Sequence, residues 1–195
     1  WIIFLMKEVW KRKVLKSEES IKITIKELGD YTNNIGKVTK GSIAYLDGPY
    51  GIFTLDKVKD PDAEIIMIAG GVGITPFLSQ LDELMHINPQ RKVTFIYGIR
   101  LPEDIIKSKD IEEIQKAMLN LKIIPVVSDD DSWAGECGLI DQQRLDRLGV
   151  CEDIDPKKEN KVYFICGPPK MLGLVQKSLK RLGVSSNLIF KEQFS

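Results

Sequence analysis

The segment AGGVGITPF (69–77) places three glycines directly before a predicted helix. Gly70, Gly71 and Gly73 let the backbone turn sharply and approach a ligand closely, and the first turn of a helix offers free N–H groups to a pyrophosphate. A tight strand–helix connection with no ligand has the same pattern. Arg100, which ends the YGIR segment, is either placed to meet a phosphate or ribose oxygen or is a solvated arginine. Together the two segments favour a site for a phosphorylated nucleotide.

Two further segments, SDDD (128–131) and CGPPKM (166–171), also follow apolar runs. Cys166 stands at the predicted edge of a sheet, where an isolated cysteine is more often a small buried residue than a reactive one. The chain has His86 as its one histidine and three cysteines that form no CxxC pair. We therefore predict no metal site and no disulfide framework.

Composition sets the broad class of the protein. The 195 residues are 43% hydrophobic and 29% charged, and the 28 basic and 28 acidic residues give a net charge near zero. Such a chain can bury a core, and it has no overall field that would attract nucleic acid. The sparse cysteines are typical of a reducing, cytoplasmic compartment. We expect a globular α/β protein of one ordinary domain or two small ones.

The elements that position these segments alternate along the second part of the chain. Continuous apolar runs are typical of strands buried on both faces, and the segments between them have helical spacing, with Thr75 as a helix N-cap and Pro76 at the first helical position. Alternating strands and helices predict a five-stranded, parallel, doubly wound sheet, which binds ligands beyond the carboxyl ends of its strands. The expected strands are 64–71, 92–100, 121–128, 161–167 and 187–191, and the expected helices are 75–85, 102–120, 141–148 and 168–182.

The first part of the chain has a different character. Residues 20–28 alternate between apolar and polar side chains, which predicts a half-buried antiparallel strand, and 42–46 fits a second strand. We expect a partial antiparallel β-barrel over residues 1–57 and a nucleotide-binding domain over 58–195. The apolar start WIIFLM is either a buried strand or the cytoplasmic end of a truncated transmembrane helix, with basic residues 11–13 on the inside.

Six motifs in a fixed order carry a family resemblance over about residues 20–195. DGPYG, GGVGITPF, YGIR, SDDDSWAGECG, CGPPKM and EQF occur in the order expected of the ferredoxin–NADP reductase superfamily. The chain most resembles its flavin- and pyridine-nucleotide-dependent reductase modules. This resemblance implies hydride transfer from NAD(P)H to FAD, followed by release of electrons to an acceptor protein or domain that carries an iron–sulfur centre, a haem or a metal chelate.

The resemblance also implies roles for individual residues, of which Cys166 and Glu192 are the catalytic candidates. Cys166 matches the turn beside the nicotinamide ring, and Glu192 matches the carboxyl-terminal element near the flavin. The implied contacts to the nicotinamide nucleotide are Gly70, Gly71, Gly73, Ile74, Thr75, Pro76, Arg100, Ser128, Asp129, Cys166, Gly167 and Pro168, and those to the flavin are Gly29, Thr32, Gly48, Tyr50 and Phe194.

Two alternatives stay open at this stage. VWKRKVLKSEES stands where such modules carry an Arg-x-Tyr/Phe-Ser motif, so a nucleotide-binding regulatory or docking domain that has lost flavin competes with the reductase. The acidic run 129–131 would repel a 2′-phosphate and favours NADH, whereas Arg100 is compatible with NADPH. We expect a cytoplasmic protein, or one on the cytoplasmic face of a membrane if a membrane domain precedes Trp1.

Overall fold

A six-stranded parallel sheet forms the centre of the fold. The computed structural model describes residues 4–5, 23–24, 30, 32–43, 45, 52–105, 109–155 and 159–193. The strands lie in the order β6-β5-β4-β3-β7-β8, and every neighbouring pair is parallel. These strands are β3 (Glu64–Gly70), β4 (Val93–Ile99), β5 (Leu121–Val127), β6 (Glu136–Cys137), β7 (Lys161–Gly167) and β8 (Ile189–Gln193).

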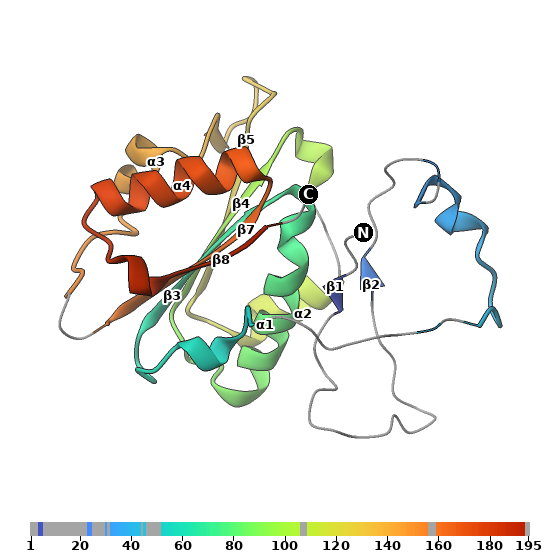
Figure 1. Cartoon of the computed structure of the whole chain (residues 1–195), viewed down its shortest axis with the longest axis horizontal. Coiled ribbons are helices and arrows are strands. Elements are labelled where there is room, and N and C mark those ends of the chain that lie inside the picture. The colour runs from blue at the N-terminus through green and yellow to red at the C-terminus, as the bar shows by residue number, and fades with distance from the viewer. Residues whose placement is uncertain are drawn as a thin grey trace.

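Helices cover both faces of this sheet (Figure 1). On one face lie α1 (Thr75–Ile87) and α2 (Lys109–Ala117), and on the other lie α3 (Gln142–Arg147) and α4 (Pro169–Arg181). Short 3-10 turns connect the elements: η1 (Thr32–Lys37), η2 (Leu55–Lys57), η3 (Gly71–Ile74), η4 (Pro102–Asp104) and η5 (Ser186–Leu188). The doubly wound fold predicted from the sequence is therefore confirmed.

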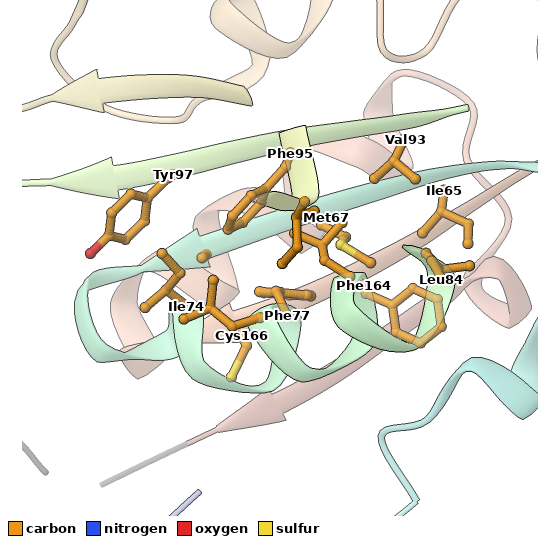
Figure 2. Close-up of a cluster of buried hydrophobic side chains, with 14 of the residues drawn as sticks. Ile65, Met67, Ile74, Phe77, Leu84, Val93, Phe95, Tyr97, Phe164 and Cys166 are labelled. Carbon is orange, nitrogen blue, oxygen red and sulfur yellow. The ribbon is translucent and has the colours of Figure 1, made fainter. Parts of the chain in front are cut away.

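Each face of the sheet has its own hydrophobic core, because alternate side chains of a strand point to opposite faces. Met67, Phe77 and Phe164 belong to the core under α1, where Figure 2 shows them packed together. Ile68 and Leu179 belong to the core under α4. Every residue of β3 and of β7 is buried, which explains why both strands are continuous apolar runs between their charged first residues and their final glycines.

Residues at the expected boundary between the two parts of the chain also contribute to the α1 core. Phe53, Leu55 and Val58 pack partly buried against that core. The ring of Phe53 makes edge contacts with Phe77 and Phe164, at centroid distances of 5.7 and 5.3 Å. Residues 52–58 are thus anchored on the α1 face of the sheet.

Several boundaries differ from the sequence-based expectations. The sixth strand, β6, was missed because its two residues are too few to show any periodicity. The strand predicted at 42–46 is wrong for the described residues Ser42, Ile43 and Tyr45, which form no strand; Ile43 is 82% exposed. The helix expected over 102–120 is divided into η4 and the shorter α2.

The start of the chain is described at only a few positions. β1 (Phe4–Leu5) pairs antiparallel with β2 (Ile23–Thr24), which agrees with the strands expected there. The turn 47–51 lies outside the described residues. No helix within the described ranges has the length and apolar character needed to cross a membrane.

A buried ionic cluster holds the amino-terminal edge of the sheet together. Glu64, at the start of β3, is 8% exposed and lies 3.0 Å from Lys92 Nζ and 3.4 Å from Lys161 Nζ. Thr94 Oγ1 donates a 3.0 Å hydrogen bond to Glu64 Oε1. Burial raises the pKa of Glu64, but the two lysines and Thr94 outweigh it and hold the pKa below its usual value. The amino-terminal ends of β3, β4 and β7 are thereby joined.

We predict that Glu64→Gln destabilises the fold by about 3 kcal/mol, because it leaves the buried Lys161 ammonium without its anionic partner. The Glu64 pKa is lower in the folded than in the unfolded chain, so its stabilisation is present above the unfolded value and is lost as the pH falls through the folded value. Urea unfolding at pH 7 and at pH 3 measures both effects. Glu113→Gln, on the exposed side of α2, is the control. Equal stability of the Glu64 and Glu113 variants at pH 7 would contradict the role of the cluster.

Candidate functional site

A pocket of about 440 Å³ lies at the carboxyl edge of the sheet, where the loops after β3, β4, β5, β6 and β7 converge. This is the edge at which doubly wound sheets bind ligands. Its volume lies within the range of small-molecule sites. The lining residues are Gly70, Gly71, Val72, Tyr97, Gly98, Ile99, Arg100, Asp104, Val126, Ser128, Gly138, Leu139, Ile140, Pro168 and Met171.

The middle of the pocket is built on closely packed glycine backbone. A Cβ atom on Gly70 would lie 2.4 Å from Met171 Sδ and 3.1 Å from Pro168 Cδ. A Cβ atom on Gly167 would lie 2.7 Å from Met171 Cε and 3.2 Å from the backbone nitrogen of Gly70. A side chain at either position would therefore have to displace the end of the Met171 side chain, which lies over both glycines, and one at Gly167 would also crowd the Gly70 backbone.

Gly71 leaves the space in front of this contact open. Its φ of +55° is in the left-handed region that favours glycine, and nothing lies within 4 Å of the place where a Cβ atom would be. Gly71 is the first residue of η3, so the backbone N–H groups at the start of this turn lie beside the pocket. A phosphate group placed there would meet backbone donors, and no side chain fills the space directly beside Gly71.

Thr75 does not play the capping role predicted for it. It is the first residue of α1, and its fully buried hydroxyl donates a 3.1 Å hydrogen bond to the Val72 carbonyl. The glycine-rich η3 turn precedes the helix directly and takes the place of a side-chain cap. Thr75 thus ties the η3 turn to the start of the helix.

Arg100, Asp129 and Ser128 form a connected group at the pocket rim. Arg100 Nε donates to Asp129 Oδ2 at 2.7 Å, and Ser128 Oγ donates to Asp129 Oδ1 at 2.6 Å. The hydrogen bonds from Ser128 and Arg100 lower the pKa of the Asp129 carboxyl. The guanidinium side chain remains 80% exposed. The two rim positions predicted from separate segments, 100 and 128–129, are therefore brought together.

Tyr97 and Asp104 line the pocket beside Arg100, and sequence reasoning missed both. Burial, with a further contribution from the Asp104 charge, raises the pKa of Tyr97 to about 12. Asp104 Oδ2 accepts a 3.1 Å hydrogen bond from the Leu101 backbone N–H. Asp104 also acts on Arg100, whose pKa is raised mainly by Asp129. Arg100 thus lies in the field of two carboxylates.

Cys166 and Glu192 are partners in the β7–β8 ladder. Cys166 is fully buried in the core under α1, close to Ile74 and Phe77 (Figure 2), and Glu192 is half-buried. Burial raises the pKa of the Cys166 thiol, and the Glu192 charge raises it further. Burial also raises the pKa of Glu192. The thiol is therefore neutral at physiological pH, and it lies under the pocket edge without lining the pocket.

The far wall of the pocket comes from residues 138–140, which the sequence analysis did not single out. Gly138 has a φ of +94°, and Leu139 is 65% exposed at the pocket. Ile140 is buried, and its Cδ1 would lie 3.0 Å from a Cβ atom on Gly98. The one sequence signal for this wall is a glycine between a short polar segment and the predicted helix 141–148.

The structure brings some of the predicted residues to the pocket and leaves others away from it. Gly70, Gly71, Arg100, Ser128 and Pro168 line it. Thr32 lies in η1 and is not a lining residue. The others in the described ranges (Gly73, Ile74, Thr75, Pro76, Asp129, Cys166, Gly167 and Glu192) are not lining residues, whereas Gly29, Gly48, Tyr50 and Phe194 lie outside those ranges.

The chemistry available at the pocket is that of a binding site. It offers backbone donors at η3, apolar walls, one exposed cation and hydroxyl groups at its rim. Within the ranges that the structure describes, no group of three or more His, Cys, Asp or Glu side chains is arranged to hold a metal ion. This arrangement fits a ligand with a phosphate at its centre and ring systems at its ends.

Comparison with known proteins also indicates a nucleotide-binding domain. Residues 67–177 match the family model of the oxidoreductase NAD-binding domain. One component of the Na(+)-translocating NADH-quinone reductase of Yersinia pestis (strain Pestoides F) is 32% identical over 170 residues, and the same component from Pseudoalteromonas atlantica is 33% identical over 170 residues. In each case the match covers 85% of this chain and 40% of the relative.

Solved structures share the fold. A ferredoxin NADP+ reductase from Neisseria gonorrhoeae with bound FAD and NADP matches with a TM-score of 0.67 at 21% identity, over 89% of this chain and 72% of that one. The cytochrome b5 reductase domain of Ulva prolifera nitrate reductase matches with a TM-score of 0.69 at 22% identity, over 84% and 66% of the two chains. The family match over residues 67–177, which is more than half of the chain, shows that the chain belongs to the oxidoreductase NAD-binding domain family.

Proposed function

We propose that this chain is the nucleotide-binding part of an NAD(P)H-dependent flavin oxidoreductase that passes electrons to an acceptor protein or domain. The observation that carries the proposal is the convergence of Gly70, Gly71, Arg100, Ser128 and Pro168 on one pocket at the carboxyl edge of the sheet. The two bacterial relatives, which are components of an NADH-quinone reductase, support an electron-transfer role. The chain spans 40% of the length of these relatives. We therefore propose electron transfer to an acceptor protein or domain and do not assign the acceptor of the relatives to this chain.

The pocket divides into regions that suit the parts of a dinucleotide. The open backbone at Gly71 and the start of η3 would hold the pyrophosphate. Ser128 and Asp129 would hold the adenosine ribose, with Leu139 in the wall beside them. The turn at Gly167 and Pro168 would hold the nicotinamide ring, close to the edge where Cys166 and Glu192 lie. These positions follow the sheet from β6 to β7 without a break.

The chain's own contribution to the reaction is binding and orientation. A reduced nicotinamide supplies a hydride and FAD accepts it when both are bound, so the chemistry belongs to the cofactors. The close packing of Gly70, Gly167 and Met171 limits how near a nicotinamide ring can come to the ends of β3 and β7. Cys166 is buried, is neutral, and directly precedes the turn at Gly167. It therefore places no charge beside the nicotinamide ring, whose own charge changes when it gives up a hydride.

Arg100 and Asp129 bear on the choice between NADH and NADPH. A 2′-phosphate requires a free cation, whereas a ribose 2′-hydroxyl is well matched to a carboxylate acceptor. In this structure the Nε of Arg100 is already bonded to Asp129, and Asp104 lies in the same pocket. The rim therefore favours NADH.

The proposed function is tested by flavin reduction. FAD-loaded protein mixed anaerobically with NADH is expected to lose its absorption near about 450 nm in a single turnover. Cys166→Ala is expected to slow this step roughly tenfold with little change in NADH affinity, because a cavity under the Gly167 turn loosens the ring position. Cys151→Ala, at a partly buried cysteine that packs against the core on the opposite face, is the control. An unchanged single-turnover rate in Cys166→Ala would remove this residue from the site. Binding of NADH with no retention of flavin would favour a regulatory or docking domain.

The glycine contact is tested by a methyl group added at Gly70. Gly70→Ala forces Met171 away from the glycines and into the pocket, so we expect the Kd for NADH to rise roughly tenfold, equivalent to about 1.4 kcal/mol. Gly173→Ala is the matched control, because a Cβ atom at that α4 position meets nothing within 4 Å. Isothermal titration of NADH into each variant measures the effect. Equal affinity in the two variants would show that the nucleotide does not lie against Gly70.

Nucleotide preference is tested at Asp129. Asp129→Ala frees the guanidinium of Arg100 for a 2′-phosphate, so the ratio of kcat/KM for NADH to that for NADPH should fall roughly tenfold. Glu103→Ala removes the same charge from an exposed neighbour of Asp104 and should leave the ratio within about twofold. If kcat/KM of the wild-type enzyme is tenfold or more higher for NADPH than for NADH, the conclusion that Arg100 and Asp129 favour NADH is contradicted.

A further inference from the structure

The pocket wall at residues 138–140 has little support from the sheet. β6 consists of only two residues, which pair with Val126 and Val127 at the end of β5. One more backbone bond, from the Gly138 N–H to the Val127 carbonyl, extends this ladder. Leu139 is then free of the ladder and largely exposed. Its position at the pocket must therefore be fixed by contacts from outside the sheet.

Arg144 supplies those contacts from behind the wall. Its Nη2 donates to the Cys137 carbonyl, and its Nε donates to the Leu139 carbonyl at 3.0 Å. Its Nη1 bonds to the carboxylate of Glu136. The three nitrogens thus hold acceptors on both sides of Gly138, which the planar guanidinium is well shaped to do.

The guanidinium is itself held in place. Arg144 lies in the first turn of α3, where Asp141 Oδ1 accepts a 3.0 Å hydrogen bond from the Arg144 backbone N–H as the helix N-cap. Its side chain is only 11% exposed. The side chain of Arg147 contacts the same Glu136 carboxylate but is 59% exposed. Arg144 and not Arg147 is therefore placed to control the wall.

We propose that Arg144 is a positioning residue for nucleotide binding: it fixes the Gly138–Ile140 wall on the adenosine side of the pocket without touching the nucleotide. This inference rests on the proposed function and adds a residue to that site. Loss of Arg144 leaves the Cys137 and Leu139 carbonyls without their donor and leaves the Glu136 carboxylate with Arg147 alone, and the short β6 cannot hold the wall by itself. The pocket would then lose affinity at its adenosine side while its nicotinamide side, formed by β3 and β7, stays intact.

Arg144→Met tests this assignment with two probes that report on different ends of the pocket. AMP reports on the adenosine side, and reduced nicotinamide mononucleotide reports on the nicotinamide side. We expect the Kd for AMP to rise roughly tenfold and the Kd for reduced nicotinamide mononucleotide to stay within about twofold. Hydrogen exchange in the peptide that spans 136–140 should become faster in the absence of any nucleotide. Arg144→Lys, which keeps the charge but presents its donors on a single nitrogen, should recover part of both effects.

Arg147→Met is the matched control and should leave both affinities and the exchange rate unchanged. Unaltered exchange over 136–140 in Arg144→Met would overturn the positioning role, whatever happens to binding. Equal weakening of both probes would overturn it too, because that result indicates a general loss of structure. If wild-type protein shows no affinity for either probe, the proposed nucleotide site itself is contradicted, and this inference falls with it.

Discussion

The close contact between the ends of β3 and β7 is the constraint on which the site depends. These two strands are neighbours in the sheet, but the chain leaves β3 toward α1 on one face and leaves β7 toward α4 on the other. The two connections therefore diverge, and a crevice opens between them at the carboxyl edge. Gly70 and Gly167 make this possible, because any side chain at either position would collide with Met171 or with backbone. Backbone donors at the start of η3 thus lie at this opening of the sheet.

The other lining residues form walls around this crevice and come from the ends of β4, β5 and β6. The end of β4 contributes an aromatic and a cation, the end of β5 contributes the hydroxyl and carboxylate that engage that cation, and the short β6 carries an apolar wall. The charges are paired with one another and lie at the rim, whereas the floor is backbone and hydrocarbon. Such a division suits a reaction in which the protein aligns two cofactor rings and takes no part in proton transfer.

The sequence predicted the sheet well because β3, β4 and β7 are buried along all or nearly all of their length and β5 is buried at its carboxyl-terminal end, and burial on both faces produces continuous apolar runs. Because the strand ends were predicted correctly, the loops that carry glycine or arginine there could also be placed at the pocket. The predictions that were wrong concern single short segments. The segment 42–46 resembles a strand in composition, but Ile43 is largely exposed, and Thr75 resembles an N-cap but follows a glycine turn that replaces a cap.

The missed parts of the site depend on contacts between distant segments. Nothing in the spacing of CGPPKM indicates that Met171 covers Gly70, a residue about a hundred positions earlier. The guanidinium of Arg144 similarly reaches back across Gly138 to carbonyls whose positions are set by β5. Such contacts follow from the order of strands in the sheet, and this order is a property of the whole fold and not of any one motif.

The most direct test of the central claim is a ¹⁵N–¹H NMR titration of the chain with NADH. The amides of Gly70, Gly71, Gly98 and Gly138 come from separate segments that meet only at the pocket, and the account predicts that all of them shift together with a single binding curve. Amides on the exposed side of α4, such as that of Gly173, should not move. Shifts confined to one of these segments, or centred on α4, would contradict a nucleotide site at the β3–β7 crevice.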